Sequence, residues 1–280
     1  MEKGLGKLPL VARVYEFMLQ RIVPKGLVKI KTEHHEMYVD TSRGGIIFSP
    51  MSQGIYEAQV TKLFENIVTR GMTFVDVGAS IGYHTLTAAR LVGEKGRVFS
   101  FEPEPHSYEL LIKNIESNGY SNITALQKAV SNKNGKARLF VPEGQFGKSL
   151  LLEDRIFPSG EQIEVDTQTL DDFFYDNSGG YTGVDVIKMD VEGAEPLVIA
   201  GMTKIIQSNR HLKIVTELNP KRLIQWGSSP QEYVDMLLRH GFEIYNINEL
   251  ANNIERVEQI DILMEQVTID DSTNLYCVRD

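Results

Sequence analysis

The chain is short of cysteine, of basic residues and of long apolar runs, and each shortage limits what it can be. Cys277 is the only cysteine in 280 residues, so no internal disulfide can form and a reducing, cytoplasmic compartment is expected. Lysines and arginines number 29 against 38 aspartates and glutamates, and the net charge of −9 argues against broad electrostatic binding of nucleic acid. No apolar run reaches about 18 residues, so no transmembrane helix is predicted.

The most informative motif also lacks something, namely one glycine. Residues 74–82 read Phe-Val-Asp-Val-Gly-Ala-Ser-Ile-Gly, and apolar residues at helical spacing follow. An apolar strand, a glycine loop and a helix in this order are typical of nucleotide-binding folds. The dinucleotide pattern requires a second glycine where Ser80 stands, because that glycine lets a pyrophosphate lie against the backbone. The loop therefore favours a nucleoside ligand without phosphates over NAD.

An acidic residue ends the next predicted strand. The run 97–101 is followed by Glu102, which lies 24 residues after Gly78. A carboxylate at this place is suited to a ribose with two free hydroxyls. A site for S-adenosylmethionine explains Asp76 inside the first strand, the glycine loop and Glu102 together, with Asp76 and the loop facing the amino-acid part of the ligand.

Two other interpretations stay open at this point. Gly78-Ala79-Ser80-Ile81-Gly82 fits the Gly-x-Ser-x-Gly pattern of α/β-hydrolases, with Ser80 as nucleophile. That fold needs a histidine at the active-site edge, whereas His211 and His240 each precede an apolar run and so fall at strand starts. The other alternative is a cofactor-binding protein without catalytic activity.

Strands and helices alternate from residue 73 onward, which predicts an α/β fold with a mainly parallel sheet and helices on both faces. The last two predicted strands are expected to pair antiparallel at one sheet edge. Two extra strands, 137–141 and 163–167, flank a segment at 142–160 that is either a mobile lid or a fixed extension of the core. The strands predicted for the main sheet are 73–77, 97–101, 123–127, 184–189, 212–217, 242–247 and 274–278.

The first 55 residues are expected to be an appendage to a catalytic domain at 56–280. An apolar stripe from Leu10 to Ile22 predicts a helix, and the alternation over 27–50 predicts a hairpin that turns at 43–45. The adjacent His34 and His35 are expected to be solvated.

A second acidic cluster follows the strand predicted at 184–189. Asp190, Glu192 and Glu195 lie at the carboxyl end of that strand, where ligands bind in open α/β sheets. Asp76, Glu102 and Asp190 are therefore expected to converge on one edge. Helix capping is the alternative role for Glu192 and Glu195.

Four segments together resemble the FkbM-type methyltransferases: 74–85 with the glycine loop, Phe-Glu-Pro at 101–103, Thr-Leu-Asp-Asp at 169–172, and Ile-Lys-Met-Asp-Val-Glu-Gly-Ala-Glu at 187–195. The resemblance covers roughly residues 56–245. It implies a Rossmann-like seven-stranded sheet and S-adenosylmethionine-dependent methylation, generally of hydroxyl groups on sugars, polyketides and similar small molecules. The acceptor within that range is not implied, and homo-oligomerisation stays open.

The resemblance also implies roles for single residues. Glu102 is expected to hold the ribose, Ala129 and Val130 to wall the adenine, and Asp190 to lie near the methionine amine or the transferred methyl. No acid stands at 129–130 for the adenine amino group, so Asn132 or a backbone carbonyl must serve. The complete set expected to bind the cofactor is Asp76, Gly78, Ala79, Ser80, Gly82, Tyr83, His84, Glu102, Pro103, Ala129, Val130 and Asp190.

The acceptor side needs a base, because an alcohol loses its proton late in methyl transfer. Asp190, Glu192 and Glu217 are the candidates for this catalytic role, and Glu217 ends a predicted strand at the same sheet edge. Asp190, Glu217 and Asn219 would alternatively hold a divalent ion through oxygen ligands. The metal-free interpretation is preferred here.

Overall fold

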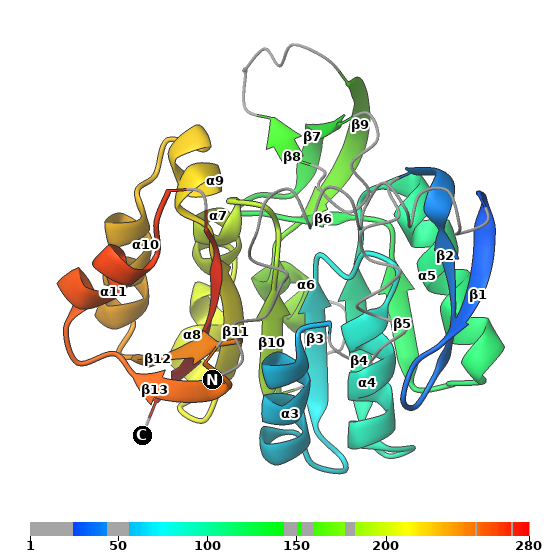
Figure 1. Cartoon of the computed structure of the whole chain (residues 1–280), viewed down its shortest axis with the longest axis horizontal. Helices are drawn as coiled ribbons and strands as arrows, with labels where there is room; N and C mark the ends of the chain where they lie inside the picture. The colour runs from blue at the N-terminus through cyan, green and yellow to red at the C-terminus, as the bar shows by residue number, and fades with distance from the viewer. Residues whose placement is uncertain are drawn as a thin grey trace, which may run out of the picture.

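The computed structural model describes residues 25–43, 56–142, 150–152, 160–176, 183–249, 251–269 and 271–279. The helix predicted over 10–22 lies outside these residues. Within them, eight strands form the central sheet in the order β13-β12-β14-β11-β10-β3-β4-β5 (Figure 1). Their bounds are β3 Thr73–Val77, β4 Arg97–Phe101, β5 Ile123–Leu126, β10 Val186–Met189, β11 Lys213–Leu218, β12 Glu243–Asn248, β13 Asn253–Arg256 and β14 Thr273–Val278.

The α/β class with a mainly parallel sheet is confirmed, and the strand count was one too low. β3, β4, β5, β10 and β11 run parallel, while β12 and β14 pair antiparallel as predicted. The eighth strand, β13, pairs with β12 at the sheet edge. Its four residues Asn-Ile-Glu-Arg are mostly exposed, so they carry no apolar alternation that marks a strand.

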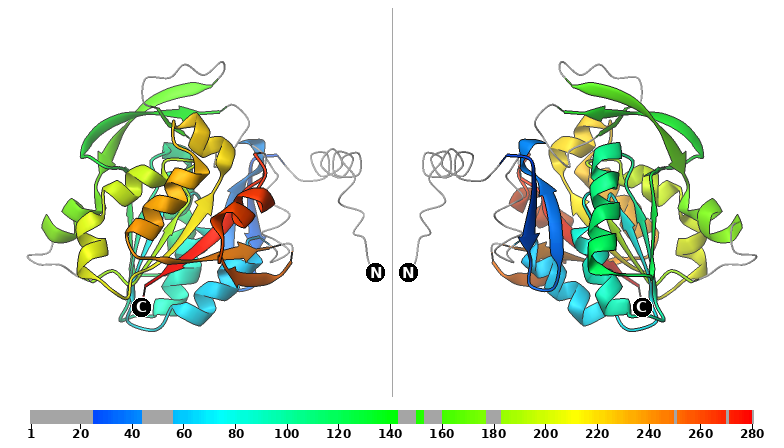
Figure 2. Two further views of the ribbon diagram at one scale, coloured as in Figure 1. Left: turned by 90° about the vertical axis from the view of Figure 1, so that its left-hand side faces the viewer. Right: turned by 90° about the vertical axis from the view of Figure 1, so that its right-hand side faces the viewer.

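Helices cover both faces of the sheet (Figure 2). Alternation along β3 explains how: Phe74 packs with α3 and α4, whereas Val75 and Val77 face the larger core on the opposite side. The helices are α3 Ala58–Ile67, α4 Tyr83–Val92, α5 Pro105–Asn118, α6 Leu170–Asp176, α7 Glu195–Ala200, α8 Thr203–Ser208, α9 Pro220–Gln225, α10 Pro230–Arg239 and α11 Ile260–Gln266. None of these described helices has the length and apolar character to cross a membrane.

A second sheet of four strands lies beyond the carboxyl ends of the parallel strands (Figure 1). Its order is β6-β9-β7-β8, and β7 and β9 confirm the two extra strands predicted between residues 128 and 170. The bounds are β6 Ala129–Val130, β7 Gly135–Val141, β8 Leu150–Leu152 and β9 Glu161–Gln168. Residues 143–149 and 153–159 lie outside the described part, and so does most of the segment for which a lid was considered.

The N-terminal hairpin turns earlier than predicted. β1 (Leu27–Lys31) and β2 (Glu36–Asp40) pair antiparallel, so the turn that joins them falls at 32–35. Local hydrogen bonds explain this turn: the Thr32 N–H donates to the His35 carbonyl at 2.8 Å, and the His35 N–H donates to Thr32 Oγ1 at 3.0 Å. The Gly-Gly pair that favoured the later position lies outside the described residues.

The hairpin packs against α5 (Figure 2). The Tyr38 N–H donates to Asn114 Oδ1 at 2.6 Å, which ties β2 to the buried face of the helix. His34 is exposed as expected, but His35 is buried and its Nε2 lies 2.9 Å from the Tyr120 hydroxyl. Burial, assisted by the positive charge of Arg90, lowers the pKa of His35 to about 4. The appendage boundary at residue 55 stays a prediction.

Candidate active site

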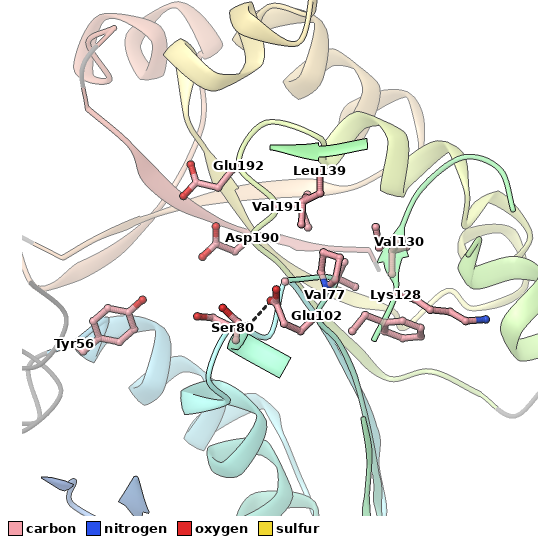
Figure 3. Close-up of a pocket in the computed structure, with 15 residues that line it drawn as sticks. Tyr56, Val77, Ser80, Glu102, Lys128, Val130, Leu139, Asp190, Val191 and Glu192 are labelled. Carbon is pink, nitrogen blue, oxygen red and sulfur yellow. Dashed lines mark hydrogen bonds between the residues drawn. The ribbon is translucent and has the colours of Figure 1, made fainter. Parts of the chain in front are cut away.

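A pocket opens where β3, β4 and β10 end, beneath the second sheet. Figure 3 shows Tyr56, Asp190 and Glu192 on one side of it and Lys128 and Val130 on the other. The predicted site residues that line it are Gly78, Ser80, Glu102, Pro103, Ala129, Val130, Asp190 and Glu192. The predicted site residues outside this lining are Asp76, Ala79, Gly82, Tyr83, His84 and Glu217. Of the predicted acids, Glu102, Asp190 and Glu192 therefore line the pocket, whereas Asp76 and Glu217 do not.

The glycine loop is shaped by its packing against the end of β10. Gly78 has φ +78°, and a Cβ at this position would lie 1.9 Å from the Asp190 carbonyl oxygen. The N–H groups of Gly78 and Ala79 both donate to the Phe101 carbonyl at 3.0 Å. Glycine is therefore required at position 78 by the backbone of Asp190, and Gly78 also lines the pocket.

Glu102 is held by two backbone donors. Its Oε2 accepts from the Ser80 N–H at 2.8 Å (Figure 3), and its Oε1 accepts from the Glu104 N–H at 2.9 Å. Burial raises the pKa of Glu102 to about 7, although both hydrogen bonds act in the opposite direction. Each carboxylate oxygen has a second lone pair, so the group retains acceptor capacity for ligand hydroxyls at the pocket.

The opposite wall comes from β6 and the residue before it. Ala129 and Val130 line the pocket there and are buried. Lys128 lines the same wall, and its Nζ donates to Gln168 Oε1 at 3.1 Å. No sequence pattern marks Lys128 as a site residue. Asn132, considered for the adenine amino group, is not part of the lining.

Asp76 lies below the loop and is fully buried. Its Oδ2 accepts from Thr85 Oγ1 at 2.6 Å, and the Lys188 Nζ lies 3.9 Å from its Oδ1. Asp76 therefore links β3 to α4 and β10 and supports the loop from beneath.

His84, which was predicted to bind the cofactor, is buried and is not part of the pocket lining. Its Nε2 pairs with the Glu57 carboxylate. Burial opposes ionisation of Glu57, but the hydrogen bond and charge of His84 outweigh it and lower the pKa of Glu57 to about 2. His211 and His240 precede β11 and β12, at the opposite edge of the sheet, as predicted. None of these three histidines lines the pocket beside Ser80, and the Nε2 of His84 is engaged by Glu57.

Asp190 lines the pocket on the same side as Tyr56 and Glu192 (Figure 3). Its Oδ2 lies 3.5 Å from the Lys188 Nζ. Burial raises the pKa of Asp190, Lys188 acts in the opposite direction, and the charge of Glu57 adds to the rise. Lys188 itself is buried, yet Asp190, Asp76 and Glu57 outweigh that burial and raise its pKa, so its ammonium stays charged.

The remaining acids extend from Asp190 toward β14. Glu192 pairs with Arg222, with its Oε2 2.9 Å from Nε. Glu217 is at the end of β11, and burial followed by the charges of Asp190 and Glu192 raises its pKa well above the usual range. Among the described residues, no group of three or more histidine, cysteine, aspartate or glutamate side chains is arranged to hold a metal ion.

Tyr56 is a pocket residue that the sequence did not reveal. It lines the pocket beside the acids, and its ring packs edge-on against Tyr83 with centroids 5.2 Å apart. Burial, and then the charges of Glu57 and Asp190, raise the pKa of its hydroxyl, so it stays a neutral hydrogen-bond donor. An isolated tyrosine before a helix carries no distinguishing pattern, and only the fold brings it to the pocket.

The sequence of this chain matches the Methyltransferase FkbM domain over residues 76–244, which is more than half of its length. The chain belongs to the FkbM methyltransferase family. The matched range contains the loop, Glu102, Asp190 and Glu217, so the resemblance seen in the sequence is confirmed. The protein-L-isoaspartate(D-aspartate) O-methyltransferase family also matches, over residues 12–135.

Individual relatives match over shorter stretches. The chain is 39% identical over 59 residues to protein-L-isoaspartate O-methyltransferase of Methanococcoides burtonii, which is 21% of this chain and 29% of that protein. It is 28% identical over 133 residues to hexuronic acid methyltransferase AglP of Haloferax volcanii, covering 48% of this chain and 51% of that protein. The chain thus spans less than two thirds of either relative. The crystal structure of an FkbM methyltransferase from Methylobacillus flagellatus superposes with a TM-score of 0.45 at 16% identity, covering 78% of this chain and 50% of that chain.

S-adenosylmethionine is the cofactor of this FkbM methyltransferase, and the pocket fits it. Glu102 offers free lone pairs for ribose hydroxyls, and the loop has no second glycine for a pyrophosphate. Asp190 supplies negative charge for a ligand that carries a sulfonium and an ammonium.

Proposed function

We propose that this FkbM methyltransferase transfers a methyl group to a hydroxyl oxygen of a small molecule or sugar, with Asp190 as the carboxylate on the acceptor side. The observation that supports this most directly is the position of Asp190. It lines the pocket between Tyr56 and Glu192, across from Glu102 (Figure 3). The relative AglP, named as a hexuronic acid methyltransferase, supports a sugar acceptor.

The residues on this side suit a hydroxyl acceptor. When bound, S-adenosylmethionine supplies a methyl group on a sulfonium that is already activated. The chain's part is then to orient the acceptor oxygen, an effect that contributes up to about 7–11 kcal/mol. The Asp190 carboxylate accepts a hydrogen bond from the hydroxyl and takes its proton, which a positioned base accelerates by about 10²–10⁴-fold. The neutral Tyr56 hydroxyl donates to another acceptor oxygen.

Glu217 and Glu192 complete the proposed acceptor side in different ways. Arg222 pairs with the Glu192 carboxylate. Glu192 therefore forms part of the pocket wall and orients the acceptor, and it does not remove the proton. Glu217 has a raised pKa, and so it holds a proton over a wide pH range and is suited to pass protons between Asp190 and solvent. The cofactor side consists of Glu102, which accepts hydrogen bonds from the ribose hydroxyls, the glycine loop, and the wall formed by Ala129 and Val130.

The test compares turnover with cofactor affinity. Asp190→Asn and Glu217→Gln keep shape but remove a carboxylate, so we expect turnover to fall far more than affinity for S-adenosylmethionine. Glu116→Gln, which changes an exposed carboxylate on α5, is the control. Activity is followed by mass spectrometry of methyl products over a panel of hydroxylated acceptors, including sugars and uronic acids.

Two outcomes would change this proposal. Cofactor binding without any methyl product across the panel would favour a binding protein without catalytic activity. We expect EDTA to leave activity intact, and activity that EDTA abolishes and Mg²⁺ restores would show that a divalent ion takes part.

A further inference from the structure

Lys188 is a buried cation beside the pocket residue Asp190. Its side chain is only 8% exposed, and its Nζ lies 3.5 Å from Asp190 Oδ2 and 3.9 Å from Asp76 Oδ1. A buried ammonium costs several kcal/mol unless it is paired. Lys188 does not line the pocket, so this cost is offset by carboxylates of the protein and not by a ligand.

The register of the sheet creates this arrangement. β10 pairs with β3 so that Lys188 is directly opposite Asp76. Asp190 follows Lys188 by two residues, and successive side chains alternate between faces, so both project toward the face that α3 and α4 cover. The lysine is thereby placed between an acid that supports the loop and an acid that faces the pocket.

Asp190 is in an environment dominated by negative charge. Glu57 at the start of α3 faces it together with Glu217 on β11 and the neighbouring Glu192. The positive charges that face it are Lys188 and, from α4, the imidazole of His84 when protonated, which is already paired with Glu57. Without the ammonium, burial and repulsion would both favour the protonated form of Asp190.

We propose that Lys188 is a positioning residue, whose ammonium keeps the Asp190 carboxylate ionised and oriented at the pocket. This inference rests on the role proposed above for Asp190. Lys188 acts through Asp190 and touches neither acceptor nor cofactor. A purely structural role, in which Lys188 only compensates Asp76, is the alternative that the experiment excludes or supports.

The experiment measures the titration of Asp190 directly. Protein labelled with ¹³C at the aspartate carboxyls is titrated by NMR between about pH 4 and 9, and the resonance of Asp190 is assigned by its loss in D190N. In K188M we expect the Asp190 carboxyl to titrate at least about one pH unit higher than in the wild type. K188R keeps the positive charge, so its Asp190 carboxyl should titrate closer to the wild-type pH, with at least half of that rise reversed.

The pH dependence of methyl transfer gives the second readout, because Asp190 is proposed to act as the base. In K188M the pH at which turnover reaches half of its maximum should rise together with the Asp190 titration, and K188R should reverse at least half of that rise. An unchanged titration of Asp190 in K188M would overturn the proposal and leave Lys188 serving Asp76 alone. If K188M does not fold, the D76N/K188M variant removes the second uncompensated carboxylate and allows the same titration. Methyl transfer that survives D190N would refute the role of Asp190 itself, while the titration would still report on Lys188.

Discussion

Replacing Gly78 by alanine tests the contact between the loop and the end of β10. The added Cβ would lie 1.9 Å from the Asp190 carbonyl oxygen and 2.9 Å from its carbonyl carbon. Both are backbone atoms of a buried strand end, so no side-chain rotation relieves the overlap. Either the loop or Asp190 must move, and both belong to the proposed site.

The expected magnitude has two parts. An alanine at φ +78° costs about 1–2 kcal/mol relative to glycine. Forcing an extra methyl group into a packed interior typically costs about 1–3 kcal/mol more. The free energy of unfolding should therefore fall by about 2–5 kcal/mol, and affinity for S-adenosylmethionine should fall as well, because Asp190 or Ser80 is displaced.

Gly119→Ala is the matched control. Gly119 has φ +69°, and a Cβ there would meet nothing within 4 Å. This variant carries the conformational cost alone, so urea denaturation should show a loss of about 1–2 kcal/mol, and calorimetry should show unchanged cofactor affinity. If Gly78→Ala proved no more destabilising than Gly119→Ala and bound the cofactor equally well, the close approach of loop and β10 would be refuted.

Three further predictions follow from buried titratable groups. The pKa of Glu102 near 7 means that ribose hydroxyls meet an ionised carboxylate only above that pH, so calorimetry should show cofactor affinity rising about tenfold from pH 6 to 8, and Glu102→Gln should abolish the rise. Burial raises the pKa of Glu195 to about 7, so the folded state binds the proton more tightly, and wild-type stability falls as pH rises from 4.5 to 7. Denaturation should show that the free energy of unfolding of Glu195→Gln, relative to that of the wild type, rises by about 2–3 kcal/mol between pH 5 and pH 8. An unchanged difference between the two pH values would contradict the buried protonated acid. His35, with its lowered pKa, contributes stability that is present above pH 6.5 and lost as the pH falls toward 4. In denaturation measurements, the free energy of unfolding of His35→Gln should therefore fall less than that of the wild type between pH 6.5 and pH 4.

The positions of the acids at strand ends were predictable because strand, loop and helix each leave a local pattern. Asp76, Glu102 and Asp190 follow or interrupt apolar runs, and parallel strands bring their carboxyl ends to one edge. What the pattern did not give is depth along that edge. Asp76 is fully buried inside β3 and is engaged by Thr85, whereas Asp190 lines the pocket.

Errors arose where local preference competed with tertiary contacts. His35 was expected to be solvated because it belongs to a polar hairpin, but docking against Tyr120 buries it. The hairpin turn was placed at a Gly-Gly pair, although the Thr32 hydroxyl stabilises a turn elsewhere. Tyr56 and Lys128 line the pocket only because elements distant in the sequence fold around them, and no sequence pattern identifies such residues.

The place of β14 has a consequence for how the protein is made. The strand is the last along the described chain, yet it lies between β11 and β12. During synthesis, β12 and β13 leave the ribosome before β14 and have no position on the sheet until it arrives. β14 also sets Asn274 opposite Glu217, and the Asn274 side chain contacts Glu57. The acidic side of the pocket is therefore assembled last, and a nascent chain that already has its glycine loop still lacks the side on which we propose that the acceptor binds.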